Sequence, residues 1–152
     1  MSVAEERSVF LRAHHAWGDG DMDTFLTYLA EDILYTVNVD GLSVPYASSA
    51  VGKEDVRQRL QLLLDTFVVN AFVVETLVHE TDHSRTIVLG YYKHKRTGER
   101  LDIKVRFHGW VENGLIKRLE EYHDAAYVEA FERFVRYLEA AAAEISGPAS
   151  SP

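Results

Sequence analysis

The spacing of apolar residues changes once along this chain, near residue 67, and that change sets the fold class. Before it, apolar residues recur at the period of an amphipathic helix. After it, from Val68 to Tyr122, apolar and polar residues alternate, as in strands with one buried face. Helices followed by a run of strands predict an α+β fold with an antiparallel sheet rather than an α/β fold.

Breaks in the pattern predict the individual elements. Helices are expected at 3–17, 21–29, 52–66 and 125–144, and strands at 33–39, 68–78, 86–95, 101–111 and 115–122. Asn113-Gly114 is a strong signal for a tight hairpin between the last two strands. We expect a single domain over residues 1–146. The tail at 147–152 has nothing apolar to bury, so it is expected to be disordered.

Composition limits the classes of protein to which this chain can belong. Its formal net charge of −8 opposes binding to nucleic acid, which requires clustered Lys and Arg. No window reaches the ~18 apolar residues of a membrane span, and the N-terminus lacks a signal-peptide pattern. The chain contains no cysteine, so disulfides and thiolate ligands are excluded. We therefore expect a cytoplasmic protein that binds neither nucleic acid nor membrane.

The most conspicuous metal-binding pattern, His79-Glu-Thr-Asp-His83, lies in the wrong structural context. The pattern H-E-x-x-H binds zinc when a helix brings the two His side chains one turn apart. Here strand-like residues flank it on both sides, and a hairpin turn would send the two imidazoles in different directions. The sequence also has no other metal-ligand cluster and no Gly-rich phosphate loop. It therefore predicts neither a metal nor a cofactor.

Short motifs follow one another along the chain in a characteristic order. They are Gly18-Asp-Gly-Asp21, Ala30-Glu-Asp32, Gly52-Lys-Glu-Asp-Val56, Val111-Glu-Asn-Gly-Leu-Ile116 and Glu121-Tyr-His-Asp124. Over residues 5–128 this ordered set resembles the SnoaL-like polyketide cyclase branch of the nuclear transport factor 2-like superfamily. The resemblance implies a cone-shaped, curved antiparallel sheet wrapped around the N-terminal helices, with an extra C-terminal helix. It also implies a pocket at the wide end of the cone and homodimers formed through the outer sheet face.

The best-known chemistry of that superfamily can be tested position by position. Ketosteroid isomerases use a tyrosine on the first helix, a base aspartate on the first strand and a protonated aspartate on the long strand. The corresponding positions here hold Ala13, Val37 and Arg106. None of these side chains can fill the role, so we do not expect isomerisation by that mechanism.

Two turns at Asn113-Gly114 fit the sequence, and they give the long hairpin different faces. A two-residue turn places Arg106 opposite Glu121, because directly opposed residues share a face. Arg106 and His108 would then line a charged pocket together with Glu121.

A three-residue turn with a glycine bulge reverses those faces. It places Val105 opposite Glu121 and Phe107 opposite Leu119, so the pocket becomes mainly apolar. The outer face then carries Arg106, His108 and Trp110, where a dimer contact is expected. This second turn buries more apolar area, which favours it.

Under either turn, the resemblance implies that Leu119, Glu121 and His123 point into the cone. A carboxylate in an apolar pocket has its pKa raised, so Glu121 is the first candidate for a general acid or base. His123 could assist as a proton shuttle, and Asp124 is a third catalytic candidate, since family cyclases place a working aspartate nearby. The side chains expected to line the pocket are Ala13, Trp17, Tyr35, Val37, Leu60, Leu64, Arg106, Phe107, His108 and Leu119.

Three functions fit these features. The first is a cofactor-free isomerase, cyclase or hydrolase that acts on a small apolar substrate through a pocket carboxylate. The second is a binding module that holds a small apolar ligand without turnover, which the missing isomerase residues favour. The third is a dimeric interaction domain with a vestigial pocket, because Trp, Tyr and Arg are enriched at interfaces.

Overall fold

The computed structural model describes residues 2–42 and 44–145, and its elements confirm the α+β fold. The helices are α1 (Val3–Gly18), α2 (Met22–Thr27), α3 (Lys53–Thr66) and α4 (Ala125–Ile145), with short 3-10 turns η1 (Asp40–Leu42) and η2 (Pro45–Ala47). The strands are β1 (Leu29–Val37), β2 (Ala50–Val51), β3 (Phe67–His79), β4 (Ser84–His94), β5 (Arg100–Glu112) and β6 (Leu115–Tyr122). The expected tail at 147–152 lies outside the described residues.

The helix boundaries follow from local hydrogen bonding. Ser2 and Glu5 form a capping box at the start of α1, in which each side chain accepts a hydrogen bond from the other residue's backbone N–H. Asp21 caps α2 by accepting a hydrogen bond from the backbone N–H of Thr24. None of the helices in the described ranges is long and apolar enough to cross a membrane.

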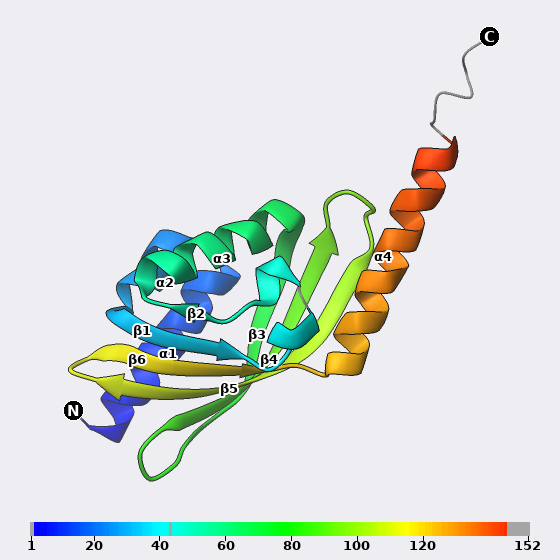
Figure 1. Ribbon diagram of the computed structural model, residues 1–152. Helices are drawn as coiled ribbons and strands as arrows, with labels where there is room; N and C mark the ends of the chain where they lie inside the picture. Colours follow the sequence, from blue (N-terminus) through cyan, green and yellow to red (C-terminus); the bar gives the residue numbers. More distant parts are fainter. Residues whose placement is uncertain (1, 43, 146–152) are drawn as a thin grey trace.

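The strands form one six-stranded sheet in the order β2-β1-β6-β5-β4-β3. All neighbouring strands run antiparallel except β1 and β6, which run parallel. This parallel pairing and the short strand β2 were not among the expected elements. Figure 1 shows the sheet curving around the N-terminal helices, with α4 crossing one end of the sheet and projecting beyond it.

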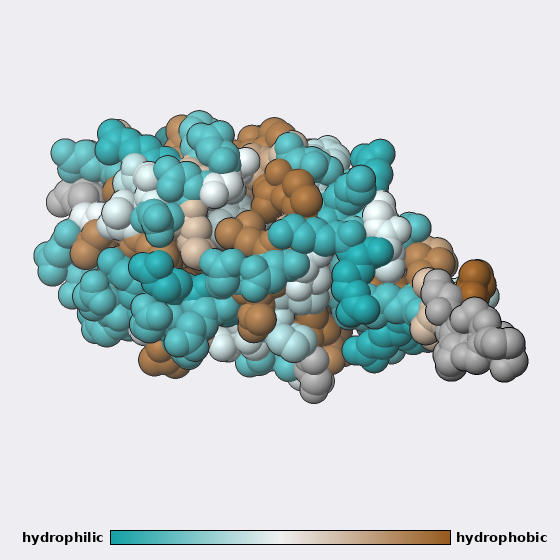
Figure 2. Space-filling view, turned by 90° about the horizontal axis from the view of Figure 1, so that it is seen from above, coloured by the Kyte–Doolittle hydropathy of each residue, from teal (hydrophilic) through white to brown (hydrophobic). Residues whose placement is uncertain are grey.

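One face of the sheet is buried against the helices, and the other is exposed. Phe10 of α1 packs so closely on β5 that a Cβ at Gly109 would lie 2.1 Å from its ring. Val105 and Phe107 on the same face are buried, whereas Arg106 on the opposite face is exposed. Figure 2 views the molecule from the side on which α3 lies in Figure 1, where hydrophilic side chains dominate and apolar patches lie between them.

The hairpin between β5 and β6 combines features of both expected turns. Asn113 and Gly114 have φ angles of 53° and 80°, as a two-residue turn requires. A β-bulge follows, because Val111 pairs with Ile116 whereas Trp110 already pairs with Arg118. The extra residue of the bulge is Lys117.

The bulge shifts the pairing by one position and thereby exchanges the two faces of the hairpin. Phe107 lies opposite Glu121, and Gly109 lies opposite Leu119. The turn is therefore the first alternative, while the faces are those expected from the second. Arg106 and His108, which the first alternative placed in the pocket, lie on the outer face instead, together with Trp110.

Candidate functional site

A cavity of about 80 Å³ lies between the helices and the buried face of the sheet. One water molecule needs only about 10–15 Å³ on this measure, so the cavity has room for a small molecule. The wall is mainly apolar and aromatic. It is formed by His14, Trp17, Phe25, Tyr35, Val39, Tyr46, Ala47, Arg59, Leu60, Leu63, Phe72, Tyr92, Leu101, Ile103, Val105, Phe107, Leu119, Glu121, His123, Val128 and Phe131.

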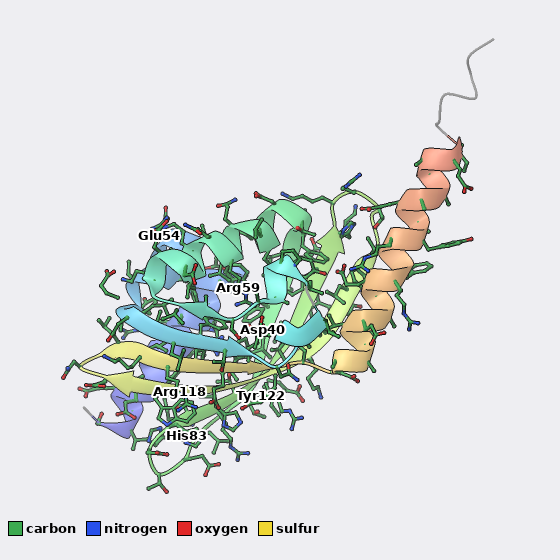
Figure 3. All side chains as sticks on the ribbon, in the orientation of Figure 1. Asp40, Glu54, Arg59, His83, Arg118 and Tyr122 are labelled. Carbon is green, nitrogen blue, oxygen red and sulfur yellow. The ribbon has the colours of Figure 1, made fainter. Side chains whose placement is uncertain are left out.

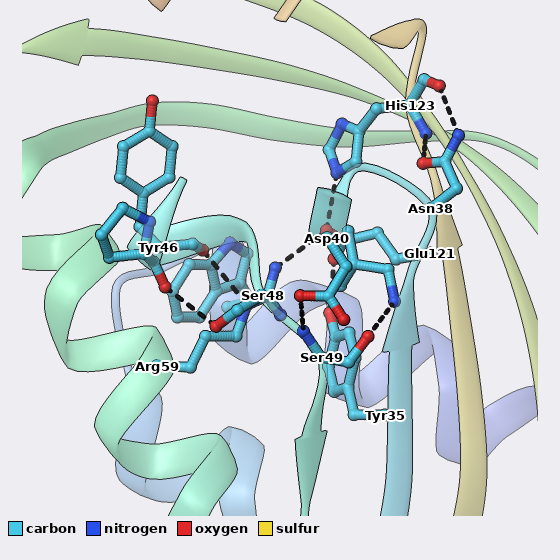
Figure 4. A network of polar contacts seen from close by, with 12 residues as sticks. Tyr35, Asn38, Asp40, Tyr46, Ser48, Ser49, Arg59, Glu121 and His123 are labelled. Carbon is cyan, nitrogen blue, oxygen red and sulfur yellow. Dashed lines mark hydrogen bonds and ion pairs between the residues drawn. The ribbon is translucent and has the colours of Figure 1, made fainter. Parts of the chain in front are cut away.

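A buried charged network centred on Glu121 interrupts this apolar wall. Tyr35 Oη donates to Glu121 Oε1 at 2.5 Å, and Arg59 Nη2 donates to Glu121 Oε2 at 2.9 Å. His123 Nε2 lies 2.6 Å from the same Oε2 atom. Figure 4 shows these side chains converging from β1, α3 and the end of β6. Glu121, Arg59 and Tyr35 are each at most 6% exposed.

Arg59 is the residue of this network that sequence reasoning missed. Its guanidinium lies 4.6 Å from the centre of the Tyr35 ring, and its Nε donates to the backbone carbonyl of Tyr46 at 3.1 Å. Arg59 lies three residues after Val56 and four residues before Leu63, so it falls on the apolar stripe of α3. This position is the signal in the sequence that could have identified it. An arginine on the buried face of an amphipathic helix needs a buried anion as its partner.

The expectation of a raised Glu121 pKa is wrong. Burial does favour the neutral acid, but the Arg59 guanidinium, His123 and the Tyr35 hydroxyl outweigh it. They hold the pKa of Glu121 well below its ordinary value. Glu121 is therefore an ionised carboxylate with its oxygens already engaged, which makes it a poor proton carrier near neutral pH.

His123 is held at both its backbone and its ring. Asn38 donates from Nδ2 to the carbonyl of His123 at 2.9 Å and accepts from its N–H at 2.8 Å. Because Glu121 is ionised and can only accept, the His123 Nε2 atom carries the hydrogen. In the neutral imidazole, Nδ1 is then left as a hydrogen-bond acceptor.

Three buried polar atoms, each belonging to a residue that lines the cavity, have no hydrogen-bond partner within the described part of the chain. They are Tyr46 Oη, Arg59 Nη1 and His123 Nδ1. Burying a polar group without a partner costs free energy, so such groups are uncommon in native proteins. Their occurrence together in one cavity indicates where a polar group of a ligand would be held.

His14 of α1 lies in the core rather than on the helix surface. It is 5% exposed, and its Nε2 lies 3.1 Å from Thr86 Oγ1. Burial and the neighbouring His15 lower the pKa of His14 to about 4. His14 is therefore neutral at physiological pH and forms part of the cavity wall, beside the ring of Phe107.

The other expected pocket residues divide into three groups. Trp17, Tyr35, Leu60, Phe107, Leu119, Glu121 and His123 all line the cavity. Ala13, Val37 and Leu64 do not line it; they pack in or against the hydrophobic core, where Val37 N–H donates to Ser49 Oγ of the covering loop. Arg106 and His108 lie on the outer face because of the bulge in β6.

Asp124 lies outside the cavity wall, at the start of α4. Its carboxylate accepts a hydrogen bond from the backbone N–H of Tyr127 at 3.2 Å, and its carbonyl accepts one from Val128. This is the arrangement of an N-cap residue. The geometry therefore gives Asp124 a structural role rather than a place in the cavity.

The H-E-x-x-H segment spans the turn between β3 and β4. His79 Nδ1 lies 3.1 Å from Ser84 Oγ, whereas His83 contacts His108 on the outer face. Residues 2–42 and 44–145 contain no group of three or more His, Cys, Asp or Glu side chains arranged to hold a metal ion.

Comparison with protein families places this geometry among known folds. The family model of the SnoaL-like domain matches residues 10–119. Comparison with curated proteins gives no match. The family match covers most of the chain and bears out the resemblance seen in the sequence motifs.

Solved structures with the same architecture carry varied descriptions. An NTF2-like protein of unknown function from Burkholderia pseudomallei is 18% identical, with a TM-score of 0.72, over 84% of this chain and 95% of that protein. A proposed SnoaL-like polyketide cyclase from Mesorhizobium loti is 25% identical, with a TM-score of 0.65, over 81% and 100% of the two chains. AclR, a proposed hydroxylase from Streptomyces galilaeus, is 16% identical, with a TM-score of 0.67, over 81% and 91%. The fold is shared while the described activities differ.

Proposed function

Because the chain belongs to the SnoaL-like domain family, we propose that it binds a small, mainly apolar molecule and catalyses a proton transfer on it without a cofactor. In this proposal His123 is the proton acceptor and Glu121 is the residue that orients it. The observation that carries the proposal is that His123 lines the cavity and has a buried, unpartnered Nδ1, while its Nε2 is held by an ionised carboxylate. The same division of roles makes carboxylate-oriented imidazoles effective bases in other enzymes.

The proton moves in a closed cycle. The substrate bond to hydrogen breaks, the proton goes to His123 Nδ1, and the electron pair stays on the substrate as an enolate-like anion. Arg59 also lines the cavity, and its unpartnered Nη1 is the donor that we assign to the oxygen on which this charge collects. Return of the proton to a different atom gives an isomer and restores His123. An isomerase or cyclase reaction needs no further reactant.

Replacing His123 with Gln tests this function. With a panel of small hydrophobic carbonyl compounds in D2O, NMR should detect deuterium incorporation next to the carbonyl for at least one compound. The variant H123Q should lower that rate roughly a hundredfold or more, because a positioned base contributes about 10²–10⁴ in rate.

The matched control is H15Q, which removes an exposed imidazole from α1 and should leave the rate unchanged. If H123Q incorporated deuterium into the substrate as fast as the wild type, His123 would not be the base. If no compound exchanged in the wild-type protein, a binding module without turnover would be the better description.

We also propose that the outer sheet face forms a homodimer contact. Trp110 stacks on His83 at 4.7 Å between ring centres, and the Arg118 guanidinium lies 4.8 Å from the Trp110 ring centre. Figure 3 shows His83, Arg118 and Tyr122 together on the side of the sheet away from Arg59. Aromatic residues and arginine are the types enriched in interfaces, and this partly exposed cluster supports a contact between two copies.

The double variant W110A/R118E should convert the dimer into a monomer. The substitutions remove the central aromatic ring and place a negative charge on each of two facing surfaces, so like charges would meet. Sedimentation velocity at micromolar concentration measures the change, and R12E on the exposed surface of α1 is the control. A wild-type monomer under the same conditions would contradict the proposed contact.

A further inference from the structure

Two imidazoles from different parts of the sequence meet on the outer face of the sheet, away from the cavity. His83 lies in the turn between β3 and β4, and His108 lies on β5. His83 Nε2 lies 3.2 Å from His108 Nδ1, and both side chains are partly exposed. Figure 3 shows His83 on the side of the sheet away from Arg59. The second histidine of the H-E-x-x-H segment therefore finds its partner on another strand rather than within the motif.

The hydrogen on the ring of His83 has a defined position. Its Nδ1 lies 2.8 Å from a carboxylate oxygen of Asp82. An aspartate with an ordinary pKa of about 3.9 is ionised at neutral pH and can only accept a hydrogen bond. His83 Nδ1 therefore carries the hydrogen, and in the neutral ring Nε2 presents a lone pair toward His108. Histidines that bind metal ions usually donate their other ring N–H to a carboxylate or carbonyl in this way.

The separation of the two ring nitrogens matches that of two ligands on one metal ion. Imidazole nitrogens bind Zn²⁺ at about 2.0–2.1 Å, usually in a tetrahedral arrangement. Two corners of such a tetrahedron lie about 3.3–3.4 Å apart. The nitrogens of His83 and His108 are 3.2 Å apart. Because both rings are partly exposed, a small rotation can aim the two lone pairs at one point, and water can complete the coordination.

We propose that His83 Nε2 and His108 Nδ1 together bind one divalent transition-metal ion of the Zn²⁺ type, with Asp82 orienting His83. Neutral imidazole is a ligand that such ions favour. The ion satisfies both lone pairs at once when His108 carries its hydrogen on Nε2. The site is separate from the proposed proton transfer, since it lies on the opposite face of the sheet from the cavity.

The surrounding charges allow a cation to bind here, with moderate affinity. Two of the three arginines near the histidines are paired with acids: Arg85 lies 2.6 Å from Glu80, and Arg118 lies 2.5 Å from Glu120. These pairs reduce the repulsion of a bound cation. Arg106 is the third arginine, and it still repels the ion. With that repulsion and only two protein ligands, we expect binding to be reversible.

Zinc titration of the full chain tests this site. Calorimetry near neutral pH should give one Zn²⁺ ion per chain, and NMR should show shifts of the His83 and His108 ring resonances. The variants H83Q and H108Q should each weaken binding at least roughly tenfold, because each removes one of two protein ligands. Half an ion per chain would mean that two copies supply the ligands, and it would overturn a site within one chain.

Asp82 gives a second test, because it acts only through His83. Its side chain is 74% exposed, so its replacement should leave the fold intact. D82A should weaken zinc binding about tenfold, as loss of a partner of a metal ligand commonly does. D82N should lose less, since the amide oxygen can still accept from the ring N–H. Equal affinity in the wild type and D82A would contradict the orienting role.

Two further histidines serve as controls. H15Q removes an exposed imidazole on α1 and should leave the zinc affinity unchanged. H79Q removes the first histidine of the H-E-x-x-H segment and should also leave it unchanged, because His79 contacts Ser84 and Glu6 instead. Circular dichroism checks that each variant is folded. The inference would be overturned if the wild type bound no zinc, if H83Q/H108Q bound it as tightly as the wild type, or if H79Q lost as much affinity as H83Q.

Discussion

Replacing Arg59 with Met is expected to lower the free energy of unfolding by about 3–5 kcal/mol at neutral pH, because it leaves the buried Glu121 carboxylate without its guanidinium partner. Arg59 and Glu121 are 5% and 6% exposed, so water cannot compensate for the loss. Chemical denaturation followed by circular dichroism measures the change.

The double variant R59M/E121Q should recover most of that stability. It removes both buried charges, and the glutamine carbonyl can still accept from Tyr35 Oη. The control is R57M, because Arg57 lies on the same helix but its side chain is 43% exposed and its ion pairs are at the surface. Surface pairs contribute about 0–1 kcal/mol, so R57M should change stability little. If R59M lowered the free energy of unfolding no more than R57M does, the buried Arg59–Glu121 pair would not be an important source of stability.

The Arg59–Glu121 pair makes the stability of the folded protein depend on pH, and the direction of that dependence follows from the pKa of Glu121. The folded-state pKa of Glu121 lies below its ordinary value of 4.5, so the folded protein binds this proton less readily than the unfolded chain. The stabilisation is therefore complete above about pH 4.5 and is lost as pH falls toward the folded-state pKa. R59M loses the largest part of this contribution, so the difference in stability between wild type and R59M should narrow in acid.

Replacing Phe67 with Ala is expected to cost about 3–5 kcal/mol, the usual range for a buried phenylalanine. Phe67 is 1% exposed and lies at the centre of an aromatic cluster. Its ring centre is 5.1 Å from that of Tyr46, 5.9 Å from Tyr92 and 6.0 Å from Phe131. These three residues line the cavity, so the substitution removes the support behind part of its wall.

Phe134 provides the matched control for this prediction. It is the same residue type on α4, but it is 47% exposed. F134A should change stability by no more than about 0.5 kcal/mol, as surface substitutions usually do. Thermal and urea unfolding of the two variants side by side would test the comparison, and a similar loss in both would show that Phe67 is not the centre of the core.

The sequence predicted the elements well where local patterns determine them. The alternation that begins near residue 67 and the Asn113-Gly114 turn predicted the hairpins, and β6 has the expected limits. The loop at residues 40–50 was harder, because η1, η2 and the two-residue strand β2 depend on tertiary contacts. One such contact is the hydrogen bond from Ser49 N–H to Asp40, which ties the two ends of that loop together.

The candidate site was predictable only in part. Glu121 and His123 could be found from their place at the end of the last strand. Arg59 could not be assigned to them, because 62 positions separate it from Glu121 along the chain. The pKa of Glu121 was predicted in the wrong direction mainly for this reason, since Arg59 is the largest of the causes that lower it. A carboxylate considered without its buried cation has only burial acting on it, and burial raises the pKa.

The extra residue at Lys117 determines how β6 responds to a change in its length. Ile116 and Leu119 are both buried although three positions separate them, because the bulge absorbs one residue between two regular stretches of the strand. Deletion of Lys117 alone would therefore leave Phe107 opposite Glu121. Deletion of Glu120 instead would place Glu121 opposite His108 on the outer face, and Arg59 would be left in the interior with no anion.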